Sequence, residues 1–167
     1  MQVINDVRCK IGNTVALIKV IIYLVIVLVV LLSMAMYPVA YGMPSSFEKF
    51  ELFYLCILSG GVGGILYCLR AVYLNACVRG EWSKNWEVWY FIRPLVSLIS
   101  GGVSYIFLKA GLLVLEAQEI DGSSSYGFLA LAFIAGLNVD NFVKKIESIA
   151  ESAWGIGKSR TSKDFDK

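Results

Sequence analysis

The segment from Val20 to Tyr37 reads VIIYLVIVLVVLLSMAMY and holds no charged residue. A helix needs about 20 mostly apolar residues to cross the hydrocarbon core of a bilayer. Small residues at Ser33-Met34-Ala35 offer a cleavage site for a signal peptide. The run is, however, longer than the apolar core of about 7–15 residues in such peptides. We therefore expect a retained transmembrane helix over 19–37.

The composition supports a membrane protein. Hydrophobic residues make up 57% of the 167 residues and charged residues 17%, whereas soluble domains average about 45–50% and about 25%. The single core of a soluble domain of this length cannot bury so much apolar surface. The sequence is also too apolar for a disordered protein. The net charge of +2 argues against a nucleic-acid binder.

Charged residues divide the rest of the chain into three further apolar segments, which predict spans over 52–72, 89–115 and 124–139. The last is short, with 14 residues from Tyr126 to Val139, so a re-entrant half-helix is the alternative to a full crossing. The expected fold is an all-α integral membrane protein with four transmembrane helices over 19–139.

The distribution of Lys and Arg predicts the orientation. Of the 15 basic residues, 13 lie in the leader, in the second connection with its edges, and in the tail. Cytoplasmic segments carry the excess of Lys and Arg in membrane proteins. We therefore expect both termini in the cytoplasm and two short acidic loops outside.

Both terminal segments show amphipathic helical spacing. The leader, residues 1–18, is expected either to lie on the membrane or to extend the first span into the cytoplasm. A helix over 140–155 is expected to continue straight out of the fourth span and to end at Gly155 and Gly157, before a flexible basic tail over 156–167. Its apolar seam is expected to bind a cytoplasmic protein or a neighbouring subunit, and consists of Phe142, Ile146, Ile149 and Ala153.

Small residues mark two of the spans. The second contains Gly60, Gly61, Gly63 and Gly64, and the third contains Ser97, Gly101 and Ser104. Such residues let helix backbones approach closely. We expect the two spans to pack together. The small residues can serve contacts within one chain or contacts between subunits. A water-lined path along the serines is a further alternative.

Four basic residues are candidates for electrostatic roles. Arg93, Lys158 and Arg160 are expected to contact anionic headgroups or an anionic ligand. Lys109 lies within the third apolar segment. It is expected either to reach the outer interface or pair with a carboxylate of the outer loop, or to contribute to a positive ring in an oligomeric pore.

Catalytic signatures are missing from the sequence. The chain has no histidine, and no metal-ligand cluster or catalytic set stands out. Gly157-Lys158-Ser159 resembles the end of a Walker A loop, but Ser152 stands where that pattern needs glycine. Cys9, Cys56, Cys68 and Cys77 form no CxxC pair and are expected to be structural. We expect no enzyme activity, no cofactor and no metal.

Four short spans of one chain enclose no aqueous path, so we expect a homo-oligomer, with a tetramer as one candidate. In size, span number and cytoplasmic termini, the chain resembles the small four-span membrane subunits of bacterial antiphage systems of the Kiwa type. This resemblance implies a scaffold or sensor in the bacterial inner membrane that works with a cytoplasmic protein. Two alternatives stay open: an oligomeric pore or membrane-perturbing effector, and an accessory subunit of a transporter or secretion complex.

Overall fold

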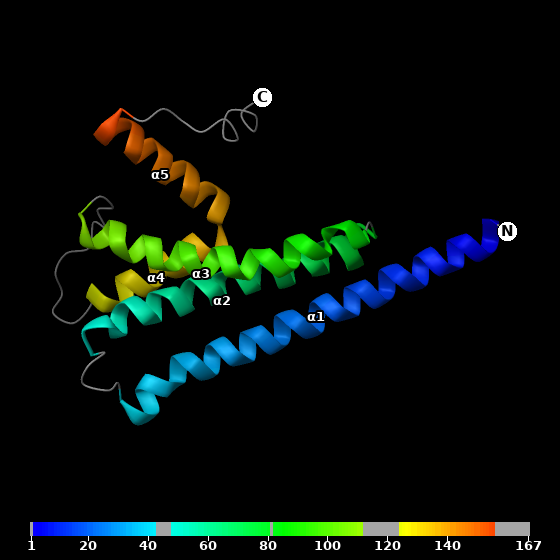
Figure 1. Ribbon diagram of the computed structural model, residues 1–167, viewed down its shortest axis with the longest axis horizontal. Coiled ribbons are helices and arrows are strands. Elements are labelled where there is room, and N and C mark those ends of the chain that lie inside the picture. Colours follow the sequence, from blue (N-terminus) through cyan, green and yellow to red (C-terminus); the bar gives the residue numbers. More distant parts are fainter. Residues whose placement is uncertain (1, 43–47, 81, 112–123, 156–167) are drawn as a thin grey trace.

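The computed structural model describes residues 2–42, 48–80, 82–111 and 124–155, and every regular element in these ranges is a helix (Figure 1). This confirms the all-helical class. The elements are α1 (Gln2–Tyr41), α2 (Glu51–Tyr73), α3 (Glu87–Lys109), α4 (Ser124–Leu137) and α5 (Val139–Trp154). Short helical turns flank α2 and α3, at Glu48–Phe50, Leu74–Val78 and Lys84–Trp86.

Three helical segments are long and apolar enough to cross a membrane: Gly12–Pro38, Glu51–Val78 and Glu87–Lys109. α4 and α5 meet that criterion only as a pair. The described residues thus contain three membrane-spanning candidates, or four if α4 and α5 form one broken span. α3 ends earlier than the sequence suggests, at Lys109, and residues 112–115 of the expected third span lie outside the described ranges.

The leader and the first span form one unbroken helix. α1 contains 40 residues, which corresponds to about 60 Å at 1.5 Å per residue, about twice the hydrocarbon thickness of a bilayer. Its N-terminal part runs out beyond the ends of α2 and α3 (Figure 1). The leader is therefore a straight extension of the first span, and Gly12 does not interrupt it.

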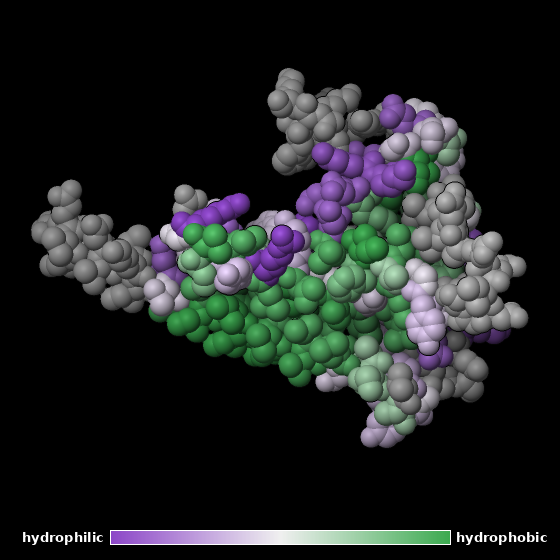
Figure 2. Space-filling view, turned by 180° about the vertical axis from the view of Figure 1, so that it is seen from behind, coloured by the Kyte–Doolittle hydropathy of each residue, from purple (hydrophilic) through white to green (hydrophobic). Residues whose placement is uncertain are grey.

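α2 lies at the centre of the bundle, against α3, α4 and α1. α1 turns Val20, Leu24 and Leu31 toward the core. Its other side leaves large aliphatic residues exposed, including Ile22, Ile26 and Val29. Hydrophobic side chains cover the bundle broadly in the space-filling view (Figure 2). A helix with so much apolar surface is suited to lipid rather than to water.

The expectation that the tail helix continues straight from the fourth span is wrong, because the chain bends by 110° between α4 and α5. Asn138 separates them with a non-helical backbone, φ −130° and ψ 62°. Asparagine is a weak helix former because its side chain competes for backbone hydrogen bonds. The other end of α5 agrees with the prediction: Gly155 closes it with φ +67°, a left-handed conformation that glycine adopts readily.

Candidate functional site: a glycine core beside a buried arginine

Two glycines bring the backbones of α2 and α3 into close contact. A methyl group built on Gly60 would lie 2.6 Å from the Ser97 carbonyl oxygen and 2.7 Å from the Gly101 Cα. A methyl group on Gly101 would lie 2.5 Å from the Cys56 carbonyl oxygen. Backbone atoms therefore fill the space that a side chain would need, and the expected pairing of the second and third spans is confirmed.

α4 joins this contact through Gly136, so three helices share it. A Cβ on Gly136 would overlap the Gly60 carbonyl. The Ser97 hydroxyl is fully buried and donates a hydrogen bond of 3.0 Å to the Gly136 carbonyl oxygen. We call Gly60, Gly64, Ser97, Gly101 and Gly136 the glycine core. The sequence reasoning missed Gly136, which lies nine residues from Gly127, the other glycine of α4, and so lacks the glycine spacing that marks Gly60 and Gly64.

The remaining small residues also face the inside of the chain. Gly61 meets Leu98 and Leu31, and Gly63 meets the backbone of α4. The Ser104 hydroxyl is buried and donates to the Gly101 carbonyl oxygen over 2.7 Å. Each of these residues thus serves packing within one chain. Their faces are occupied by other residues of the same chain.

Arg93 is a buried cation near one end of this bundle. Its side chain is 6% exposed, and Nη1 lies 3.1 Å from Oδ2 of Asp140, the second residue of α5. The guanidinium lies over two rings, with Cζ 4.8 Å from the centroid of Tyr67 and 5.5 Å from that of Trp89. Nε and Nη2 are buried without a hydrogen-bond partner among the described residues. One carboxylate and two aromatic faces therefore hold the charge.

Further rings surround this pair. Trp82 stacks on Tyr90 at a centroid distance of 5.4 Å, and Trp89 meets Tyr90 edge-on at 4.9 Å. The Asn75 amide donates to the Tyr90 hydroxyl over 3.3 Å. We call Tyr67, Trp82, Trp89 and Tyr90 the aromatic cluster, and the end of the bundle that carries it the aromatic end. Amphipathic rings of this kind gather at membrane–water interfaces.

The placement of Arg93 differs from the expected headgroup contact. Because Asp140 and the aromatic cluster enclose the guanidinium, the partner that the structure provides is a carboxylate of the same chain. The sequence held a weak signal for this pair: Asp140 is the first charged residue after the fourth apolar segment. In the expected topology, Asp140 leaves the fourth span on the same side of the membrane on which Arg93 begins the third.

The other candidate residues are dispersed. Lys109 is exposed at the last position of α3, at the end of the span rather than within it. Phe142, Ile146 and Ile149 are half-buried on α5, whereas Ala153 is exposed. Lys158 and Arg160 lie outside the described ranges. Cys56 and Cys68 are fully buried free thiols within α2, consistent with a packing role.

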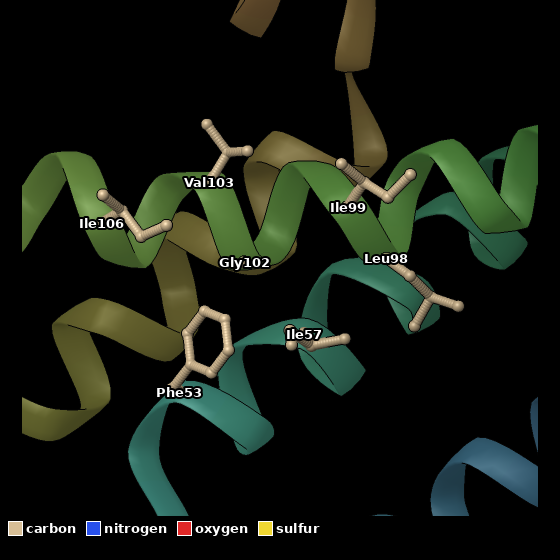
Figure 3. A pocket seen from close by; sticks show the side chains of 7 residues that line it. All are labelled: Phe53, Ile57, Leu98, Ile99, Gly102, Val103 and Ile106. Carbon is tan, nitrogen blue, oxygen red and sulfur yellow. The ribbon is translucent and has the colours of Figure 1, made fainter. Parts of the chain in front are cut away.

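A groove of about 300 Å³ opens between α2 and α3. Figure 3 shows Phe53 and Ile57 along one wall and residues of α3 along the other, with Gly102 between them. The α3 side chains are Leu98, Ile99, Val103 and Ile106. A lining of this kind suits an acyl chain or an apolar helix.

The described residues hold no group of three His, Cys, Asp or Glu side chains that could bind a metal ion. What the geometry provides is a rigid three-helix junction and an ion pair that ties α5 to it. No family model, curated protein or solved structure matches the chain. Its function therefore has to be argued from these residues.

Proposed function

We propose that the protein is an oligomeric scaffold or sensor of the bacterial inner membrane, with both termini in the cytoplasm, that binds a cytoplasmic protein. The observation that carries this proposal is the extension of α1. Residues 2–12 continue the first span as a helix, roughly 16 Å long at 1.5 Å per residue. A rigid helix standing out from the membrane is a natural docking element for a soluble protein.

The orientation rests on the basic residues. Residues 1–19 and 140–167 carry nine of the 15 Lys and Arg residues, an excess that favours the cytoplasmic side. α1 projects from the aromatic end, whereas α5 leaves the bundle near the middle of α3 and runs toward the opposite end (Figure 1). The Asn13 amide donates to the Trp82 carbonyl oxygen over 3.3 Å, which joins the base of the α1 extension to the aromatic end.

Oligomerisation is proposed through surfaces other than the glycine core, whose faces are filled. The exposed aliphatic side of α1 and the groove between α2 and α3 are apolar features that a second copy can use. A ridge of side chains on one helix packs into a groove of this kind. The alternative of a pore through one subunit has less support, because backbone contacts close the α2–α3–α4 junction. A role in antiphage defence rests on the resemblance in architecture alone.

One purification tests both parts of the proposal. The protein is produced together with the products of its neighbouring genes, extracted in mild detergent, and measured by native mass spectrometry. We expect a multiple of the 18.5 kDa chain and a bound soluble protein. A mass of one chain would contradict the oligomer.

Two deletions locate the docking element. Deleting residues 2–11 should remove the soluble protein, and deleting 159–167 is the matched control that should retain it. The reverse pattern would transfer recognition to the basic tail. Membrane extraction of both variants has to match the wild type, since the deletions leave the spans intact.

A further inference from the structure

The groove between α2 and α3 lies in the half of the bundle away from the aromatic end. Its α3 wall runs from Leu98 to Ile106, in the second half of that helix. Gly102 forms its floor, since a Cβ there would lie 3.2 Å from Ile57 and 3.4 Å from Phe53 of the α2 wall (Figure 3). The volume of about 300 Å³ is at the lower end of the range for ligand pockets, about 300–1,000 Å³. The groove therefore has room for a narrow apolar ligand.

Lys109 continues the face of α3 that lines the groove. It follows Gly102 by seven residues and Ile106 by three, and both spacings return to nearly the same face of a helix. Its side chain is exposed, and no acidic group among the described residues forms an ion pair with it. Glu51, at the start of α2, precedes Phe53 by two residues and so lies on another face of that helix. The α3 wall of the groove therefore ends in a positive charge.

The groove and Lys109 together match the length of one lipid leaflet. Leu98 and Lys109 are 11 residues apart, or about 16 Å along a helix, close to half of the hydrocarbon thickness of about 30 Å. Glu87 and Lys109, the charged first and last residues of α3, are about 33 Å apart by the same rise. Lys109 therefore lies at the level of the headgroups of one leaflet, and the groove lies beside the acyl chains of that leaflet.

We propose that the groove binds one phospholipid with an anionic headgroup, with an acyl chain between α2 and α3 and the phosphate at Lys109. A chain in the groove contacts protein on two sides, which increases its dispersion contacts over those on a flat helix surface. A lysine at headgroup level attracts anionic lipid.

A second copy fits the same place less well. Residues 20–37 of its α1 contain no acidic side chain to pair with Lys109, whereas a phospholipid carries its negative charge at the end of its acyl chains. For the oligomer, this leaves the exposed side of α1. The lipid site goes beyond the proposed function, since it needs neither an oligomer nor a protein partner.

Native mass spectrometry tests the site, because one spectrum reports both bound lipids and the number of subunits. The protein is delipidated in detergent and titrated with phosphatidylglycerol. The comparison ligands are phosphatidylcholine, which has the phosphate but no net charge, and glycerol phosphate, which has no acyl chain. We expect phosphatidylglycerol to bind first, one per chain, and glycerol phosphate not to bind. Equal binding of phosphatidylcholine would overturn the role of charge, and binding of glycerol phosphate would overturn that of the chain.

Lys109→Gln should weaken the binding of phosphatidylglycerol about fivefold, because one lysine near a membrane surface contributes about 1 kcal/mol to the attraction of anionic lipid. Lys49→Gln neutralises another exposed lysine at the same end of the bundle and is the matched control, which should bind as the wild type does. Equal losses in both variants, or no loss in Lys109→Gln, would overturn the assignment of the phosphate to Lys109.

Val103→Phe should fill the groove and remove the first bound lipid. Val88→Phe, the same change at an exposed position near the start of α3, is the matched control and should retain it. Ile106→Trp narrows the groove from an exposed position, so it provides a second test that leaves the core intact. Thermal unfolding verifies that all variants fold.

Lipid binding that survives in both groove variants would overturn the proposal. So would a loss of subunits in these variants without a loss of lipid, because a second copy would then be the occupant. A wild-type spectrum with the mass of one chain and a bound lipid would support the lipid site while contradicting the oligomer.

Discussion

Gly60 and Gly102 differ in what surrounds them, although both are buried helical glycines. A methyl group at Gly60 would press against backbone atoms of α3, at 2.6 and 2.7 Å. At Gly102 the nearest atom is Cγ1 of Ile57, at 3.2 Å, which a small side-chain shift can accommodate. Overpacking against rigid atoms typically costs about 1–3 kcal/mol.

We therefore expect Gly60→Ala to lower stability by about 2 kcal/mol. Gly102→Ala should stay close to wild type, since the helix preference of alanine, about 1 kcal/mol, offsets the shift of Ile57. Thermal unfolding of both variants in the same detergent is the measurement. Equal melting temperatures would show that the glycine core is looser than these contacts imply.

The Arg93–Asp140 pair allows a double-mutant cycle. Removing one partner of a buried pair can cost about 3–5 kcal/mol, but Asp140 is largely exposed, so solvent screening reduces the expected coupling to about 1–2 kcal/mol. We expect Arg93→Gln and Asp140→Asn to be non-additive by that amount in the free energy of unfolding. Additive effects would mean that the ion pair contributes little.

Arg93→Lys separates charge from shape at the same position. Lysine keeps the positive charge but lacks the planar group that stacks on Tyr67 and Trp89. We expect it to restore only part of the stability lost in Arg93→Gln. Full restoration would show that the aromatic faces of the cluster are incidental to how the cation is held.

At the level of elements, α1 offers a test of its own continuity. Gly12 lies within the helix, and a methyl group there meets no atom within 4 Å. Gly12→Ala should therefore stabilise the extension by up to about 1 kcal/mol and slow amide exchange over residues 2–12. Hydrogen exchange followed by mass spectrometry measures this. Faster or unchanged exchange would indicate that the extension does not hold the helical form.

The turn between α4 and α5 shows where sequence reasoning ends. Helical spacing predicted α5 almost to the residue, and Gly155 predicted its end. The bend was missed because the apolar residues continue through Asn138 at helical spacing. In the bent chain, Asp140 pairs with Arg93, which lies 47 positions earlier in the sequence. Local patterns carry no information on such a distant pair.

At the level of the whole molecule, hydropathy and charge located the long spans, because a bilayer imposes a minimum length on every apolar helix. The contact of α2 with α3 was also predictable, since clustered glycines have a packing reason in a membrane. The participation of α4 in the glycine core was not. Gly136 becomes meaningful only when Gly60 and Ser97 are placed beside it in three dimensions.

The orientation and the number of crossings can be decided together. α1 ends, α2 begins, α3 ends and α4 begins at the end of the bundle opposite the aromatic end (Figure 1). If this end faces outward, as the basic residues predict, Ser46→Cys and Ser124→Cys should react with an impermeant thiol reagent in intact cells. The background lacks the native cysteines, and permeabilised cells provide the control.

Ser162→Cys then reports on α4. If α4 crosses completely, Ser162→Cys should react only after permeabilisation. The bend of 110° also fits a half-helix that enters the membrane and returns, and in that case Ser162→Cys would react from outside together with Ser124→Cys. Such labelling would reduce the crossings to three and place α5 on the outer surface. The Arg93–Asp140 contact favours labelling only after permeabilisation, because it ties the start of α5 to the half of α3 that lies toward the aromatic end.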